Sequence, residues 1–368
     1  SRQRMQAPDL HVSCPTKTSS STSATKHGSE PPPLPPVRCI IKAGGAAITH
    51  KAQLETLQQE VLRRVCQSVA AAAAAIADSH CGHGPAGSSS QAGACDGDGE
   101  QGGGIVLVHG AGSFGHHPAS EYGVARGPLT DPRVRQGFAL TRSSVTRLNG
   151  LVVGELLAAG VSAVGLSPFG HYTASNREVS TSGVHAVAAC LRSGLLPVLH
   201  GDAVLDEQLG CSILSGDTLV RELAERMRPD WVVFLTNVAG VFDRPPEEAG
   251  ARLLRRILVR KDGSWRVAEV EGGSGADGVG DRDASVRMRA DEHDVTGGIA
   301  LKVEEAARVA RLGIPVLIVQ AGSEHGAAAC RLGPWVASQP HQQQQPQHLP
   351  AQQQLGSCHV SSAGEGAV

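Results

Sequence analysis

The sequence contains few aromatic residues, no long apolar run and almost no net charge. Aromatic side chains make up 3 % of the 368 residues, so a hydrophobic core has to be built from valine, leucine, isoleucine and alanine. The longest apolar run, 69–77, is mostly alanine and is much shorter than the roughly 20 residues that cross a bilayer. A net charge of −2 argues against a nucleic-acid surface. We therefore expect a soluble protein whose partners are neither membranes nor nucleic acids.

Cysteine pairs with metal-binding or redox spacing are also missing. Nine cysteines are scattered along the chain without a Cys-x-x-Cys pair, which is typical of reduced thiols rather than of a disulfide framework. The run His80–His83 has no second pair of ligands nearby, so we expect no metal site there. A cytoplasmic location is the resulting expectation, with an organellar transit peptide in residues 1–36 as the alternative.

Low-complexity sequence flanks and interrupts the rest of the chain. Residues 1–36 are rich in serine, threonine, proline and basic residues, and residues 334–368 in glutamine, proline and histidine, so both are expected to be disordered. Stretches rich in glycine and small or charged residues, at about 77–104 and 262–290, predict two insertions. The rest of 37–325 then forms one folded domain.

One stretch, Ile105–His117, combines a strand with a glycine loop and histidines. The apolar residues 105–108 predict a buried strand, and three glycines follow within the next seven residues. Glycine lets the backbone bend tightly and approach a ligand closely. A helix that begins near Phe114 would direct its unpaired N–H groups and positive dipole end to the same place. The stretch therefore predicts a phosphate site with an imidazole at its rim.

Other predicted strand ends and one helix start carry glycine, lysine or aspartate. They are Lys42 with Gly44 and Gly45, Gly201 with Asp202, Ser215–Asp217, and Gly297 and Gly298 with Lys302. Two glycine loops can each hold a phosphate, and lysines between them can neutralise the charge that moves from one to the other. The sequence has neither a P-loop nor the protein-kinase signature set. Spacing alone predicts a phosphate-handling α/β enzyme.

Strand and helix patterns alternate along the chain. Asp131 and Pro132 begin a long helix that ends at Gly160, and residues 53–69 have helical spacing of apolar residues. Apolar runs at 161–166, 195–199 and 231–236 predict strands. Such alternation predicts a three-layer α/β/α sandwich with a mostly parallel central sheet. Sheets of this kind bind ligands at the carboxyl ends of their strands.

Several motifs in this order resemble the amino acid kinase superfamily and, within it, the isopentenyl phosphate kinase branch. They are Ile40–Gly45, Val108–His116, Leu214–Asp217 and Asp294–Gly298. The resemblance covers about residues 37–322 without the two insertions. Its most discriminating feature is the Gly-Ser-Phe-Gly-His run, because a histidine there separates this branch from relatives that phosphorylate carboxylates, carbamate or UMP. The resemblance implies ATP-dependent phosphorylation of isopentenyl phosphate to isopentenyl diphosphate, with Mg²⁺ at the nucleotide phosphates and a homodimeric enzyme.

The resemblance also implies roles for individual residues. His116 would donate a hydrogen bond to the acceptor phosphate, and Lys42 would bridge the transferring oxygens. Lys51 would lie near the moving phosphate, while Asp217 would hold Lys42 and Lys302. The implied ATP-binding residues are Lys42, Gly44, Gly45, Gly112, Thr236, Gly298 and Lys302. The implied acceptor-binding residues are Ala111, Gly115, His116 and Gly216, with the long helix lining an apolar pocket.

Five positions depart from the pattern of the family. Ala46 replaces a serine, His50 an aspartate, Ala111 a glycine, and Asn237 and Ala239 replace two carboxylates on the nucleotide side. Two other functions therefore stay open. One is a sister kinase with another small phosphate or phosphonate acceptor, as in fosfomycin-type kinases. The other is a catalytically weak, kinase-like nucleotide-binding protein.

Four of the polar residues also have a structural interpretation. Asp217 fits the N-cap of a helix. His109 and His117 are expected to be structural, and Asp202 fits a structural or a functional role equally well.

Overall fold

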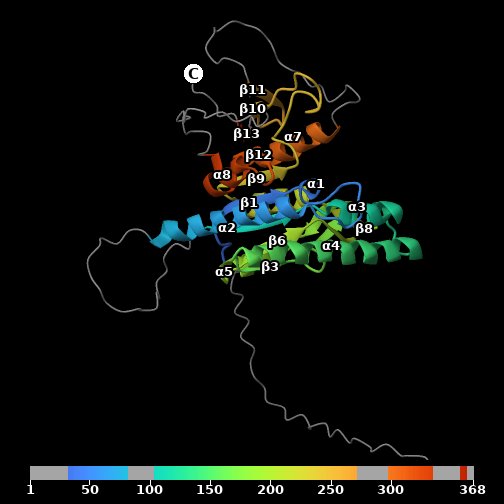
Figure 1. Ribbon diagram of the computed structural model, residues 1–368. Helices are drawn as coiled ribbons and strands as arrows, with labels where there is room; N and C mark the ends of the chain where they lie inside the picture. Colours follow the sequence, from blue (N-terminus) through green and yellow to red (C-terminus); the bar gives the residue numbers. More distant parts are fainter. Residues whose placement is uncertain (1–31, 82–102, 272–296, 335–356, 363–368) are drawn as a thin grey trace, which may run out of the picture. The chain divides into compact units, whose positions relative to one another are not determined.

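A nine-stranded sheet organises the described residues from Leu34 onward, and by its contacts the chain divides into residues 1–33 and 34–368. The computed structural model describes residues 32–81, 103–271, 297–334 and 357–362, without the side chains of 79–81, 297–302, 357 and 362. In sheet order (Figure 1) the strands are β11 (Trp265–Val270), β10 (Leu254–Val259), β13 (Ser357–Ser362), β12 (Val316–Gln320), β9 (Trp231–Thr236), β1 (Val37–Ala43), β2 (Gly104–His109), β6 (Leu196–His200) and β3 (Ala163–Gly165).

The six strands from β12 to β3 are all parallel. Strands β9 and β6 are buried along their whole length, because helices cover both faces of the sheet at these strands. Parallel strands place their carboxyl ends at one edge of the sheet. This edge therefore receives the residues that follow β1, β2, β6 and β9.

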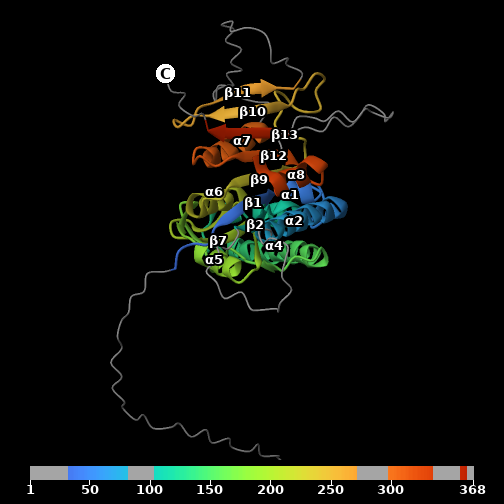
Figure 2. The same cartoon turned by 90° about the vertical axis from the view of Figure 1, so that its left-hand side faces the viewer.

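Helices cover both faces of the sheet, so the predicted three-layer α/β/α sandwich is confirmed (Figure 2). One face is covered by α1 (Gly45–Ile48), α2 (Gln59–Cys81), α3 (Gly112–Glu121), α4 (Pro132–Ala158) and α8 (Glu324–Leu332). The other is covered by α5 (Val184–Arg192), α6 (Gly216–Met227) and α7 (Gly297–Ala310). Both core clusters consist largely of aliphatic side chains, as the scarcity of aromatic residues requires.

A smaller sheet at the end of β6 returns the chain to the same edge. Its order is β5 (Glu178–Thr181), β4 (Thr173–Ser175), β7 (Asp202–Asp206) and β8 (Gly210–Leu214). β7 begins directly after β6 and pairs with β8 as an antiparallel hairpin, in which Asp202 lies opposite Leu214. The hairpin therefore brings the chain back beside Gly201, where Ser215 is the N-cap of α6 and Gly216 its first residue.

Helix α2 lies further along the chain than expected. The sequence predicts a helix over 53–69 and an insertion from about 77, whereas α2 spans Gln59–Cys81. Residues 50–58 instead form a turn, in which the Gln58 side chain donates to the carbonyls of Ala46 and Thr49. The run of alanines extends the helix at its other end, since alanine is the strongest helix former. Residues 82–102 lie outside the described part of the chain.

Two strands lie in ranges that were expected to lack structure. β11 pairs with β10 as an antiparallel hairpin inside the expected insertion 262–290. β13 fits between β10 and β12 inside the expected disordered tail 334–368. Both expectations are wrong for these segments, because period-two patterns such as Cys358 and Val360, which are buried, suffice once partner strands are present.

No helix among the described residues is long and apolar enough to cross a membrane. Six cysteines have described side chains. All six carry free thiols, and five of them are buried.

Candidate active site

Two glycine loops contact each other at the carboxyl edge of the sheet. A Cβ on Gly45 would lie 2.4 Å from the nitrogen of Gly112, and a Cβ on Gly110 would lie 2.6 Å from the nitrogen of Gly45. Gly112 also has a φ of +51°, which favours glycine. Glycine at these positions therefore lets the loop after β1 and the loop after β2 pack backbone against backbone.

Thr49 fastens the two loops together. Its buried hydroxyl donates to the Gly45 carbonyl over 2.8 Å and accepts the N–H of Ser113 over 3.0 Å. Sequence reasoning missed this threonine, although it lies only four residues after Gly45. A hydroxyl in a run of buried apolar residues is the signal that could have found it.

Helices α3 and α6 begin on either side of Gly201. A Cβ on Gly201 would lie 3.4 Å from the nitrogen of Gly216 and 3.6 Å from the nitrogen of Ala111. The first N–H groups of a helix have no partner within the helix, and they carry the positive end of its dipole. Two helix starts that face one glycine form a cradle for an anion. Ala111, which replaces a glycine, has a φ of −69° and fits without strain.

Lys42 and Asp217 form an ion pair across the edge of the sheet. Lys42 Nζ lies 2.8 Å from Asp217 Oδ1, and the two side chains are 14 % and 34 % exposed. The N-cap of α6 is Ser215, whose Oγ accepts the N–H of Thr218. The interpretation of Asp217 as the N-cap is therefore wrong, and its carboxylate is available to orient the lysine.

His116 lies on α3 beside the charge of Lys51. The surrounding protein removes part of the solvent around the His116 ring and so lowers its pKa from the ordinary value. The nearby charges of His117 and Lys51 lower this pKa further. The residue itself stays exposed, as do Lys51 and His117. A neutral imidazole still donates one N–H, and a bound phosphate dianion would favour the charged ring.

A cavity of about 580 Å³ opens beside this histidine. The glycine loops and the hairpin contribute Ala111, Gly115 and Gly201 to its wall, while Ala119, Val145 and Ile213 make part of the wall apolar. The site thus combines an anion cradle with a partly apolar cavity.

The buried histidines at the ends of β2 and β6 belong to the core. His109 and His200 stack with ring centroids 5.7 Å apart, and Asn149 lies 3.2 Å from Nε2 of His109. Burial lowers the pKa of His109 to about 3. The prediction that His109 is structural agrees with this neutral, enclosed ring.

The structure describes the predicted nucleotide-binding residues less completely. Thr236 ends β9, and its hydroxyl donates to the Val238 carbonyl over 2.7 Å. Gly298 and Lys302 belong to α7, but their side-chain surroundings lie outside the described residues. Within the described part of the chain, no group of three histidine, cysteine or acidic side chains could hold a metal ion.

Asp202 lies in the cavity wall and is paired with Arg142 on α4. Sequence reasoning did not single out Arg142. The available signal was Thr141 beside it, a polar residue on the apolar face that Phe138 and Val145 define.

The fold and the site define a phosphate-transferring α/β/α enzyme. A model of the amino acid kinase family matches residues 92–320, more than half of the chain. The chain belongs to the amino acid kinase family.

Within that family the similarity is to isopentenyl phosphate kinases. The isopentenyl phosphate kinase of Arabidopsis thaliana is 44 % identical over 308 residues, which cover 80 % of this chain and 90 % of that protein. The isopentenyl phosphate kinase of Methanothermobacter thermautotrophicus is 32 % identical over 59 % of this chain and 76 % of that protein. A crystal structure of isopentenyl phosphate kinase matches with a TM-score of 0.58 and 27 % identity, over 80 % of this chain and 96 % of the other. The resemblance inferred from the motifs is confirmed.

Proposed function

We propose that this protein transfers the γ-phosphoryl group of ATP to isopentenyl phosphate, giving isopentenyl diphosphate and ADP. An oxygen of the acceptor phosphate attacks the γ-phosphorus, and the bond from that phosphorus to the bridging oxygen of ADP breaks. The observation that carries the proposal is His116 at the wall of a partly apolar cavity whose polar side is an anion cradle. A phosphate with a short hydrocarbon chain matches both parts.

The acceptor phosphate would occupy the cradle between α3 and α6. The backbones of Ala111, Gly115 and Gly216 would surround it, and His116 would donate an N–H to one of its oxygens. Preorganised donors of this kind stabilise charge that develops in the transition state. The apolar wall would receive the isopentenyl chain.

The nucleotide would lie on the side of the first glycine loop. Lys42, oriented by Asp217, would neutralise the transferring oxygens, and Lys51 would add positive charge near them. The remaining ATP-binding residues of this proposal are Gly44, Gly45, Gly112, Thr236, Gly298 and Lys302. Phosphoryl transfer depends mainly on such positioning and electrostatics.

Mg²⁺ enters the proposal as the companion of the ATP phosphates. The ion usually keeps several waters and binds through phosphates with one or two carboxylates rather than in an all-protein cage. Among the described residues, no group of three histidine, cysteine or acidic side chains forms such a cage. When bound, Mg²⁺ would shield phosphate charge, and Asp217 is the described carboxylate on that side.

An assay of ADP release tests the proposed function. We expect turnover with ATP and isopentenyl phosphate that exceeds turnover with fosfomycin or other small phosphates and phosphonates. Product analysis should identify isopentenyl diphosphate. A better rate with a different acceptor would contradict the assignment of the substrate. ATP binding in calorimetry without ADP release for any acceptor would contradict the assignment as an enzyme, and Ala46, Asn237 and Ala239 would then explain the loss.

We also propose that the enzyme is a homodimer in the cytoplasm, as the resemblance and the free cysteines suggest. Light scattering of the purified chain tests the first statement, since a monomeric mass would contradict it. Localisation of the tagged full-length protein tests the second.

A further inference from the structure

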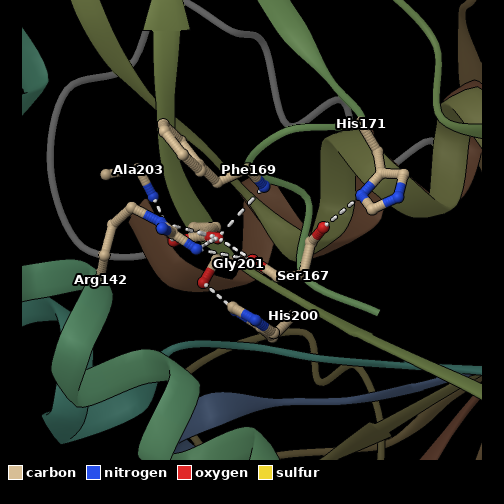
Figure 3. A network of polar contacts seen from close by, with 8 residues as sticks. Arg142, Ser167, Phe169, His171, His200, Gly201 and Ala203 are labelled. Carbon is tan, nitrogen blue, oxygen red and sulfur yellow. Dashed lines mark hydrogen bonds and ion pairs between the residues drawn. The ribbon is translucent and has the colours of Figure 1, made fainter. Parts of the chain in front are cut away.

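The Asp202 carboxylate is saturated with hydrogen-bond donors, although it lies in a cavity wall. Figure 3 labels the residues that donate to it, which are Arg142, Ser167, Phe169 and Ala203. Its side chain has no exposed surface. Arg142 donates from Nε over 3.2 Å and from Nη2 over 3.3 Å, and the Ser167 hydroxyl donates over 2.9 Å. The backbone N–H groups of Ala203 and Phe169 donate over 2.8 Å and 3.4 Å. No lone pair of this carboxylate is left for a substrate.

The guanidinium of Arg142 is equally constrained. Its carbon lies 4.0 Å from the centre of the Phe169 ring, and Nη2 also donates to Ser167 over 2.7 Å. A planar guanidinium that stacks and donates in a fork cannot be replaced by the single ammonium of lysine without loss of geometry. The pair therefore fixes the distance and the angle between α4, which carries Arg142, and the start of β7, which carries Asp202.

The pair joins two walls of the acceptor cavity. Arg142 belongs to α4, whose residues Thr141 and Val145 line the cavity, and Val145 Cγ1 would lie 2.9 Å from a Cβ on Gly115. Asp202 directly follows Gly201, which faces the nitrogens of the anion cradle. A shift of Asp202 would therefore move the turn that bounds the cradle.

A buried ion pair is seldom the most stable solution, because the desolvation of both charges offsets their attraction. Its best-attested benefit is a unique arrangement of the surrounding elements. In an enzyme, a misplacement of about 1 Å can cost about a hundredfold in rate. The fixed geometry of the Arg142–Asp202 pair can therefore keep the residues around the acceptor cavity in place.

We propose that Arg142 is a positioning residue for the acceptor phosphate, which acts through Asp202 on the turn at Gly201. This inference rests on the proposed function, in which the cradle holds the acceptor. Arg142 itself does not need to touch the substrate. We expect its effect mainly on the acceptor, because the partners of Asp202 lie on α4 and in the segment before β4, and Gly201 beside it faces the anion cradle.

Arg142→Lys tests the inference, because it keeps a positive charge beside Asp202 and removes the fork and the stacking. We expect the KM for isopentenyl phosphate to rise about tenfold, the KM for ATP to stay within twofold, and kcat to fall less than the acceptor KM rises. Ser167→Ala removes one donor from the same carboxylate and should give a smaller change in the same direction. Arg147→Lys is the matched control. Arg147 lies on the same helix as Arg142, and its ion pair with Glu55 is more exposed.

An acceptor KM within twofold of wild type in folded Arg142→Lys would overturn the inference. Equal increases of both KM values together with a lower melting temperature would also overturn it, because they indicate a general structural role. A second readout needs no turnover. With ADP at saturation, inorganic phosphate should raise the melting temperature of wild type more than that of Arg142→Lys. Equal shifts, or no shift in wild type, would refute the inference, whereas a wild-type enzyme without activity on isopentenyl phosphate would refute the proposed function.

Discussion

Two aspartates at the same edge of the sheet are paired with cations in opposite ways. Asp217 makes one ion pair of 2.8 Å with Lys42 and keeps 34 % of its side chain exposed. Asp202 has no exposed side-chain surface and accepts hydrogen bonds from four residues, Arg142 among them. The first pair is accessible and made by a compact ammonium on a flexible stem, so the lysine can turn to a phosphate. The second is enclosed and rigid, so it is suited to hold shape.

The comparison predicts that Lys42→Ala removes activity without removing the fold. We expect turnover to fall about a thousandfold, as for the loss of one main electrostatic group in a transition state. The melting temperature should change little, because water can reach the Asp217 carboxylate that remains. ADP release and thermal unfolding measure the two effects. Arg38→Ala, which removes an exposed ion pair with Asp230, is the control, and less than a tenfold loss in Lys42→Ala would contradict the role of the lysine.

Asp202→Asn should show the reverse behaviour. It leaves Arg142 without its charged partner in a largely buried setting, so we expect a loss of about 3 kcal/mol in the free energy of unfolding. Asp217→Asn should cost less than about 1 kcal/mol, because its pair is accessible to solvent. Urea denaturation of both variants checks the difference. Equal losses would remove the distinction between an accessible and an enclosed pair.

His116 and His117, neighbours on α3, extend the comparison to a residue with a proposed catalytic role and one without. His116→Ala should lower turnover about a hundredfold through the loss of one donor to the acceptor phosphate, while calorimetry should show unchanged ATP binding. His117→Ala is the matched control on the same helix, since His117 is exposed and has no role in the proposal. Turnover of His116→Ala close to that of wild type would refute the assignment of this histidine.

The sheet and the two glycine loops could be predicted because local sequence determines them. An apolar run followed by glycine, as at Val108 to Gly112, needs no knowledge of distant residues. The contacts of Asp202 could not be predicted in the same way, because its partners come from α4 and from the segment before β4. β13 was missed for a related reason, since it depends on pairing with β10 and β12. The ion pair of Lys42 and Asp217 was anticipated only through the resemblance to a family, since 175 positions separate the two residues.

The enclosed histidines predict how the stability of the enzyme depends on pH. Burial lowers the pKa of His109 from 6.5 to about 3, and it also lowers the pKa of His200, although Asp202 opposes that shift. The unfolded chain binds protons at these imidazoles below pH 6.5, whereas in the folded protein burial shifts proton binding at both rings to lower pH. For His109 the stability contributed by the neutral ring is therefore complete above about pH 6.5 and falls as the pH decreases towards 3, by up to about 1.4 kcal/mol per pH unit. The lowered pKa of His200 acts in the same direction. Urea denaturation between pH 7 and 5 measures the slope, with His117→Gln as a control that should keep it. Stability that stays constant from pH 6.5 to 5 would show that these rings accept protons in the folded state, and the contrast between enclosed and accessible groups would then fail.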